Sequence, residues 1–136
     1  MASKLSATER IAIARPAGVD PSINWQGSQK SANFYKKVFQ KDPDGSEGGY
    51  YGFMAGKGFI TFGPHDKVRG KNANPERIMF NFETKEVKRE FERIKKLGAA
   101  VVAEPYNPAE DPKGMIATFS DPDNNYFQLM TPWENK

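Results

Sequence analysis

The chain has 136 residues, about the length of one ordinary domain, and its 38% apolar and 27% charged residues are typical of a folded globular protein. It has no cysteine, which excludes disulfides, thiolate nucleophiles and cysteine-ligated zinc. Residues 1–20 hold no apolar run long enough for a signal peptide or a membrane span, so we expect a cytoplasmic protein with no membrane partner. The formal net charge is +3, but the lysines do not concentrate in one place, so we expect no nucleic-acid binding.

Residues 1–21 form an N-terminal extension. It either adds a strand through Arg10 to Arg15 or lies along the surface, and the flanking prolines do not decide between these. A strand is predicted over Ser22–Ser28, with Ile23 and Trp25 facing the core. A helix follows over Ser31–Gln40, with Phe34, Val38 and Phe39 at inward positions.

A hairpin is predicted next, from the strands YYGFM and GFITFG. Their connection, Ala55-Gly56-Lys57-Gly58, suits the positive φ of a tight turn. Between helix and hairpin, the segment QKDPDGSEGG is polar and glycine-rich, so a strand there is either missing or very short. The first half of the chain therefore spans residues 22–63, and a linker covers residues 64–75.

The second half, residues 76–132, shows the order β-α-β-β-β more clearly. Its helix is predicted over Lys85–Leu97, where apolar residues repeat at helical spacing, Thr84 can cap the start and Gly98 can end it. The strands around it are RIMFNFE before the helix and AAVVAEP, MIATFS and YFQLM after it. The two halves share this order, which indicates an imperfect duplication within one domain, residues 22–136.

Two segments carry a resemblance to a known family. The sequence FSDPDNNYFQL (Phe119–Leu129) resembles the closing strand-turn-strand of the vicinal oxygen chelate superfamily, the glyoxalase/bleomycin resistance/dioxygenase proteins, and NFYKKVF resembles its first helix. The resemblance implies an α+β fold of two βαβββ modules that form a curled, cup-shaped mixed sheet. In the motif itself we expect Asp121 and Asp123 to build the turn by bonding backbone amides, and Asn124 or Asn125 to adopt the left-handed conformation.

In this family, metal ligands come from the first and last strand of each half. Here those positions hold Gln128, Arg77, Thr61, and Ser22 or Asp20, depending on register. Arginine cannot ligate a cation, and hydroxyl or amide groups are poor ligands for a transition metal. We therefore expect no metal site and no cofactor, which weakens the case for a metal-dependent isomerase, dioxygenase or transferase.

Period-two alternation along the strands assigns side chains to the inside of the cup. The candidate ligand-binding residues, including the only histidine, are Asn24, Gln26, Phe59, Thr61, His65, Arg77, Met79, Asn81, Tyr126, Gln128 and Met130. An inward Arg77 would favour an anionic ligand, whereas an outward one would pair with Glu76 or Asp66. His65 is either a residue near the ligand or an ordinary loop histidine.

No nucleophile with an adjacent base and no phosphate-binding glycine loop is present, so we can assign no catalytic residue. The sequence favours a metal-free small-molecule binding protein with a cup for a polar or anionic organic ligand. The alternative is a lyase, isomerase or dioxygenase with an atypical site, using His65, Tyr126 or Glu104 as acid or base; an interaction module is the third possibility. The resemblance also implies a homodimer, for which Tyr50, Tyr51 and Trp133 would suit the contact.

Overall fold

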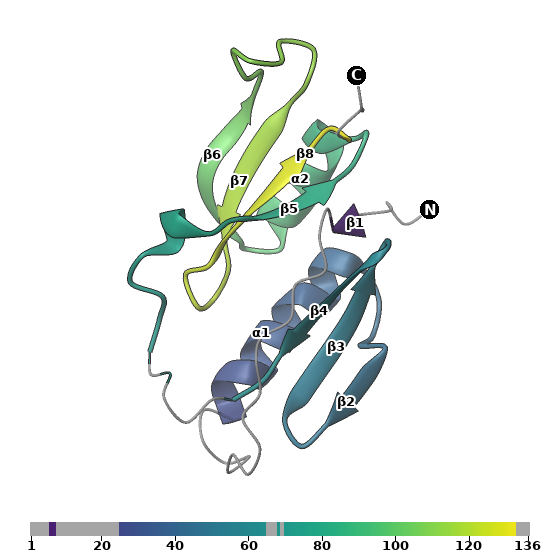
Figure 1. Ribbon diagram of the computed structural model, residues 1–136, viewed down its shortest axis with the longest axis vertical. Coiled ribbons are helices and arrows are strands. Elements are labelled where there is room, and N and C mark those ends of the chain that lie inside the picture. The colour runs from purple at the N-terminus through teal and green to yellow at the C-terminus, as the bar shows by residue number, and fades with distance from the viewer. Residues whose placement is uncertain (1–5, 8–24, 65–67, 69, 133–136) are drawn as a thin grey trace.

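The computed structural model describes residues 6–7, 25–64, 68 and 70–132 (Figure 1). Asn24, His65 and Trp133, to which we assigned expected roles above, lie outside these residues. The elements in chain order are β1 (Ser6–Ala7), α1 (Trp25–Phe39), β2 (Gly45–Glu47), β3 (Tyr50–Ala55), β4 (Gly58–Phe62), a 3-10 turn (Pro75–Arg77), β5 (Phe80–Glu83), α2 (Val87–Lys96), β6 (Ala100–Tyr106), β7 (Ile116–Ser120) and β8 (Tyr126–Met130).

The strands form two sheets. One has five strands in the order β1-β5-β8-β7-β6, and the other has three in the order β2-β3-β4. β5 and β8 are parallel, because α2 and the meander β6-β7 separate them in the chain, and all other strand pairs are antiparallel. The second half is therefore the predicted βαβββ module, and the mixed α+β architecture is confirmed.

The first half differs from the prediction at its start. A strand over Ser22–Ser28 is wrong for the described residues 25–28, which form the first turn of α1. Once a helix has nucleated, each added residue gains a hydrogen bond at little further cost, so α1 extends beyond its apolar positions towards the N-terminus. Gln26 therefore lies on α1 and not on a strand of the sheet.

The predicted strand RIMFNFE also begins later than expected. Pro75 starts a 3-10 turn that includes Arg77, and the strand β5 begins only at Phe80. Proline fixes its φ near the helical value and favours the first position of such a turn. The alternating aromatic residues of RIMFNFE nevertheless suggested a strand more strongly than Pro75 suggested a turn. Arg77 is consequently exposed, ahead of the sheet and not within it.

Two short strands complete the sheets. β2 lies in the polar, glycine-rich segment where the sequence allowed a very short strand, and it has only three residues. The N-terminal extension adds β1, which pairs antiparallel with the end of β5 and lies next to β4, between the two sheets (Figure 1). This strand is at Ser6–Ala7; residues 10–15, where we expected it, lie outside the described part.

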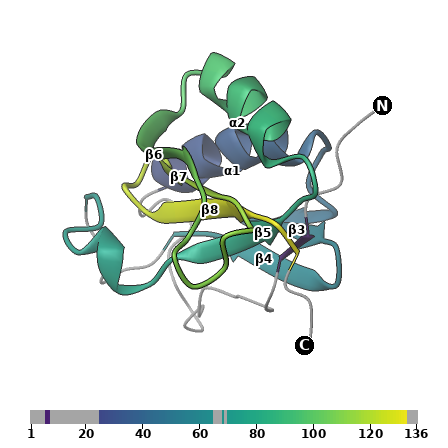
Figure 2. The same cartoon turned by 90° about the horizontal axis from the view of Figure 1, so that it is seen from above.

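Both helices lie on the same side of the strands (Figure 2). Between helices and sheets is one continuous core, dominated by aromatic rings that are almost completely buried: Tyr35, Phe53, Phe62, Phe82, Phe91, Phe119 and Phe127. Tyr35 stacks on Phe62 with ring centroids 4.6 Å apart, and Phe91 stacks on Phe119 at 5.1 Å. Among the described residues, no helix is long and apolar enough to cross a membrane.

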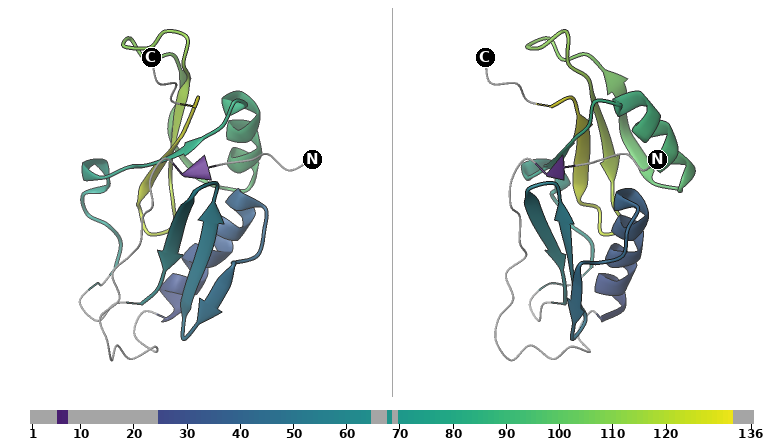
Figure 3. Two further views of the ribbon diagram at one scale, coloured as in Figure 1. Left: turned by 45° about the vertical axis from the view of Figure 1, so that its right-hand side comes forward. Right: turned by 90° about the vertical axis from the view of Figure 1, so that its right-hand side faces the viewer.

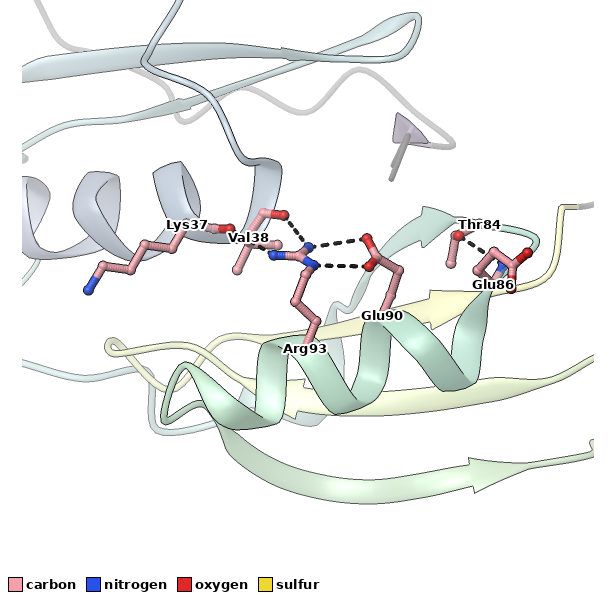
Figure 4. A network of polar contacts seen from close by, with 6 residues as sticks. All are labelled: Lys37, Val38, Thr84, Glu86, Glu90 and Arg93. Carbon is pink, nitrogen blue, oxygen red and sulfur yellow. Dashed lines mark hydrogen bonds and ion pairs between the residues drawn. The ribbon is translucent and has the colours of Figure 1, made fainter. Parts of the chain in front are cut away.

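A charged pair joins the two helices (Figure 4). Glu90, only 1% exposed, accepts hydrogen bonds from Nε and Nη2 of Arg93 at 2.9 and 3.2 Å. The same guanidinium donates to the carbonyl oxygens of Lys37 and Val38 at the end of α1, at 3.0 and 2.7 Å. Arg93 thus neutralises a buried carboxylate and satisfies carbonyls that a helix end leaves unpaired, which fixes α2 against α1.

The turn between β7 and β8 makes a second connection between the halves. Asp121 Oδ1 accepts from the backbone amides of Asp123 and Asn125 at 2.9 and 2.8 Å, and Asn124 has φ +61°, so the turn roles predicted for Asp121 and Asn124 are confirmed. The Asp123 carboxylate instead accepts from the Ser31 hydroxyl on α1 at 2.7 Å. The other oxygen of Asp121, Oδ2, accepts from the buried hydroxyl of Tyr35 on α1 at 2.8 Å. Burial raises the pKa of Tyr35 well above its usual value, so its hydroxyl stays a proton donor; burial also raises the pKa of Asp121, partly offset by these hydrogen bonds.

Removing the Tyr35 hydroxyl should therefore weaken the link between α1 and the turn. We expect Tyr35→Phe to lower the free energy of unfolding by about 1–3 kcal/mol, because Asp121 Oδ2 would keep only the 3.3 Å bond from Asn125 Nδ2. Urea denaturation measures this loss. The control is Tyr106→Phe, an exposed tyrosine on β6, which should change stability by less than about 0.5 kcal/mol. Equal effects of the two substitutions would mean that the Tyr35 bond contributes nothing specific.

Candidate functional site

The sheet face that points away from the helices carries most of the candidate residues. Along β8, Phe127 and Leu129 are fully buried beneath the helices, whereas the alternating side chains Tyr126, Gln128 and Met130 are half-buried. Along β5, Phe82 is buried in the core and Asn81 is half-buried. Because successive side chains of a strand point to opposite faces, Asn81, Tyr126, Gln128 and Met130 lie on the face opposite the helices, here called the open face.

Three polar side chains form a row across this face. Asn81 on β5 is the register partner of Gln128 on β8, and Gln128 is the register partner of Thr118 on β7. Gln128 Nε2 donates to Thr118 Oγ1 at 3.2 Å. The Oδ1 atom of Asn81 is buried and has no hydrogen-bond partner among the described residues. A buried acceptor without a donor costs about 1–3 kcal/mol, so this atom marks a position where a bound group could donate.

Other predicted residues lie elsewhere. Phe59 and Thr61 are on β4, on the face opposite the buried Ile60 and Phe62, but in the three-stranded sheet. The ring of Phe59 lies over Gly52, where an added Cβ would meet its Cζ atom at 2.6 Å, so a larger residue there would displace the ring. The remaining candidates are Met79 and Arg77, both exposed ahead of β5, Gln26 on α1, and Asn24 and His65 outside the described residues.

Two residues of the open face were missed in the sequence. Thr118 follows from the same alternation along MIATFS, but a lone threonine in an apolar strand gave no functional signal. Glu83, two residues beyond Asn81 and half-buried, is the register partner of Met130 and lies on the same face. From the sequence we assigned it no role.

The family's metal chemistry does not fit these residues. No group of three or more histidine, cysteine or acidic side chains that could hold a metal ion occurs among the described residues. Gln128, at the position where the family carries an acidic ligand, donates its amide to Thr118, and Arg77 is neither on the strand nor able to ligate a cation. The polar row on the open face offers two amides and a hydroxyl in place of a ligand set.

A separate cleft of about 380 Å³ lies on the helix side of the molecule. It is formed by α1, Leu97 after α2 and Pro122 in the β7–β8 turn, with Lys30 and Lys37 at its edges. Its residues come from a helix surface and a turn that are far apart in the sequence, so no local pattern could have predicted it. The cleft contains none of the residues of the polar row.

The unpaired acceptor can be tested without a ligand. We expect Asn81→Leu to raise the free energy of unfolding by about 1 kcal/mol, because an apolar side chain removes the cost of the unsatisfied oxygen. The control is Asn107→Leu, which breaks the 2.8 Å bond from Asn107 Nδ2 to the carbonyl of Gly114 and should destabilise by about 1 kcal/mol. Urea denaturation compares both with wild type. If Asn81→Leu destabilises as much as the control, the oxygen has a donor in the native protein.

Comparisons with known proteins agree with this architecture. The family model described as a glyoxalase-like domain matches residues 22–130. No curated protein matches the sequence significantly. Two solved structures with similar folds are fosfomycin resistance proteins FosX: that of Listeria monocytogenes (25% identity, 77% of this chain and 82% of that one, TM-score 0.57) and that of Mesorhizobium loti (20% identity, 93% and 91%, TM-score 0.56).

A third similar structure is a glyoxalase/bleomycin resistance protein from Catenulispora acidiphila, with 9% identity over 92% of this chain and 96% of that one and a TM-score of 0.59. At such low sequence identity, the similarity to these structures supports the fold and nothing further. The family match covers most of the chain, includes both sheets except β1, and contains the Asp121 turn. The chain belongs to the glyoxalase-like domain family, within the vicinal oxygen chelate superfamily.

Proposed function

We propose that this protein binds a polar organic small molecule on the open face of its five-stranded sheet, without a metal ion. The observation that carries the proposal is the buried Oδ1 of Asn81 beside Gln128, which has no hydrogen-bond partner in the part of the chain that the structure describes. Proteins rarely leave a buried acceptor unsatisfied, and such an atom next to a second amide suits a ligand that completes the hydrogen bonds. Tyr126 and Met130, which flank Gln128 on the same face, supply apolar surface for the rest of the ligand.

The absence of a metal from this function is inferred from the chemistry of the side chains. One FosX structure from Listeria monocytogenes is a complex with Mn(II) and 1S,2S-dihydroxypropylphosphonic acid. In the present chain, three of the four positions that the resemblance assigns to ligands hold Gln128, Thr61 and Arg77, and the fourth, Ser22 or Asp20, lies outside the described residues. The first three are an amide, a hydroxyl and a permanent cation, which bind divalent transition metals poorly or not at all. We therefore propose that the protein holds its ligand by hydrogen bonds and not through a metal ion.

An enzyme of the same superfamily with an atypical site is the second candidate. Tyr126 favours it, because this half-buried phenol lies on the open face two residues from Gln128, within the region that a bound ligand would occupy. A phenol can act as a general acid or base when it is positioned against a substrate. Glu104, also considered from the sequence, is exposed on β6 at the sheet edge.

The cytoplasmic location remains a prediction.

A thermal-shift screen of polar small molecules tests the binding function. We expect stabilising compounds whose effect persists in excess EDTA and whose affinity falls about tenfold in Gln128→Leu, the consequence of losing a hydrogen bond of about 1.4 kcal/mol. The matched control is Asn33→Leu, which alters the cleft on α1 and should leave affinity unchanged. Elemental analysis of protein purified without chelator should find no transition metal. About one ion per chain, lost in Gln128→Ala, would contradict the proposal.

We also propose that the protein is a homodimer, but through a different surface from the one expected. Tyr50 and Tyr51 are half-buried, and the Tyr50 hydroxyl donates to the carbonyl of Pro64 at 2.8 Å, so both tyrosines are engaged within the fold. The strand β6 is a sheet edge with exposed apolar side chains, namely Val101, Val102 and Tyr106. An apolar strand edge with unpaired backbone groups favours association with a second copy.

Sedimentation velocity should therefore show a particle of about 31 kDa, twice the chain's 15.3 kDa. Val102→Lys should shift it towards the monomer, because a lysine on an edge strand opposes pairing. The control Val68→Lys replaces an exposed valine outside the strands and should leave the dimer intact. A 15 kDa species for the wild type at all accessible concentrations would rule out the dimer.

A further inference from the structure

We propose that the group recognised on the open face is an organic ammonium, a positively charged hydrogen-bond donor, and that Asn81 and Glu83 receive it. The inference rests on the proposed binding function and specifies its ligand class. It reverses the anionic preference expected from the sequence. Three observations lead to it: the charges of the strands, the hydrogen-bonding state of the polar row, and the position of Arg77.

The first observation concerns charge. The chain contains 20 lysine and arginine residues, yet none of them, and no histidine, occurs in β3, β4, β5, β7 or β8. The only charged residue in these five strands is Glu83. The single formal charge that these strands carry is therefore negative, in a protein whose net charge is positive.

The second observation concerns which hydrogen-bonding atoms are free. Gln128 uses its Nε2 donor on Thr118 Oγ1, whereas its Oε1 acceptor has no protein donor among the described residues. At Asn81 the buried, unpaired atom is again the acceptor, Oδ1. The buried atom of the row without a partner among the described residues is thus an acceptor, which a donating group of a ligand would satisfy and an accepting group would not.

The third observation removes the reason for expecting an anion. That expectation required Arg77 to point into the sheet from a strand. The structure places Arg77 in the 3-10 turn before β5, where its side chain is exposed to solvent. An exposed guanidinium is screened by water and contributes little to the selectivity of a half-buried site.

The geometry of β5 joins these observations into one site. Asn81 and Glu83 are two residues apart on one strand, so their side chains lie on the same face about 7 Å apart along the strand. An ammonium between them could donate hydrogen bonds to Asn81 Oδ1 and to the Glu83 carboxylate. The amide oxygen would then have a partner, and the carboxylate would have a counter-ion. Met130, the register partner of Glu83 on the adjacent β8, offers a thioether beside the cation, and Tyr126, on the other side of Gln128, offers an aromatic ring for the apolar body of the ligand.

Three probes with one apolar frame test the proposal: benzylammonium, benzyl alcohol and benzoate, at pH 7. Amide chemical shifts from NMR titration of the full chain report both affinity and location. We expect the probes to perturb the amides of Asn81, Glu83 and Gln128, with benzylammonium binding at least about tenfold more tightly than benzoate, as for one charge-assisted hydrogen bond.

Substitutions separate charge from hydrogen bonding. Glu83→Gln should weaken benzylammonium about tenfold and leave benzyl alcohol nearly unchanged, because only the counter-charge is removed. Asn81→Leu should weaken the binding of both benzylammonium and benzyl alcohol, since both would donate a hydrogen bond to Asn81 Oδ1. The control Glu92→Gln, on the exposed face of α2, removes the same charge away from the sheet and should change neither affinity.

The outcomes distinguish this inference from the function on which it rests. Benzoate binding at the same amides as tightly as benzylammonium would overturn the ammonium preference and leave the binding function standing. Equal weakening of benzylammonium by Glu83→Gln and Glu92→Gln would also overturn it, because net charge alone would then explain the effect. If none of the probes perturbs the amides of the polar row, both the inference and the proposed site are wrong.

Discussion

The hydrogen bond from Tyr35 to Asp121 is the contact on which the arrangement of the two halves depends. Asp121 organises the β7–β8 turn through two backbone amides and receives the hydroxyl of a tyrosine that belongs to the first half. The ring of that tyrosine stacks on Phe62 in the other sheet. A buried carboxylate is costly unless it is hydrogen-bonded, so α1 is held over the turn and both helices cover the same side of the strands (Figure 3). In the described part of the chain, no helix consequently covers the opposite face.

Much of this fold could be predicted because the relevant signals are local. The α2 helix shows apolar residues at helical spacing, and the turns at Gly56 and Asn124 have the positive φ that their residue types indicated. The start of α1 and the 3-10 turn at Pro75 were missed, because a few alternating residues cannot distinguish a strand from a helical turn. In the site, alternation placed Asn81 and Gln128 on one face. The unpaired state of Asn81 Oδ1 could not be predicted, since it depends on strand register and on every neighbouring donor.

The stabilising contacts and the proposed site lie on different faces of the strands, which explains how the fold can persist while the chemistry of the site changes. The stabilising contacts, namely the aromatic core, the Glu90–Arg93 pair and the Asp121 turn, all lie on the helix side or at the strand ends. Substitutions on the open face therefore cost little stability, and an acidic metal ligand can be replaced by an amide such as Gln128 without loss of the architecture. On this surface we propose that hydrogen bonds and the negative charge of Glu83 recognise the ligand.

The central claim is that this open face binds a small molecule through protein groups alone. A crystal structure of protein purified without chelator and soaked with benzylammonium tests it most directly, with diffraction data collected at wavelengths that reveal transition metals by anomalous scattering. The account predicts the ammonium nitrogen about 3 Å from Asn81 Oδ1, with no anomalous peak near Gln128. A metal ion held by Gln128 together with side chains from outside the described residues would contradict it.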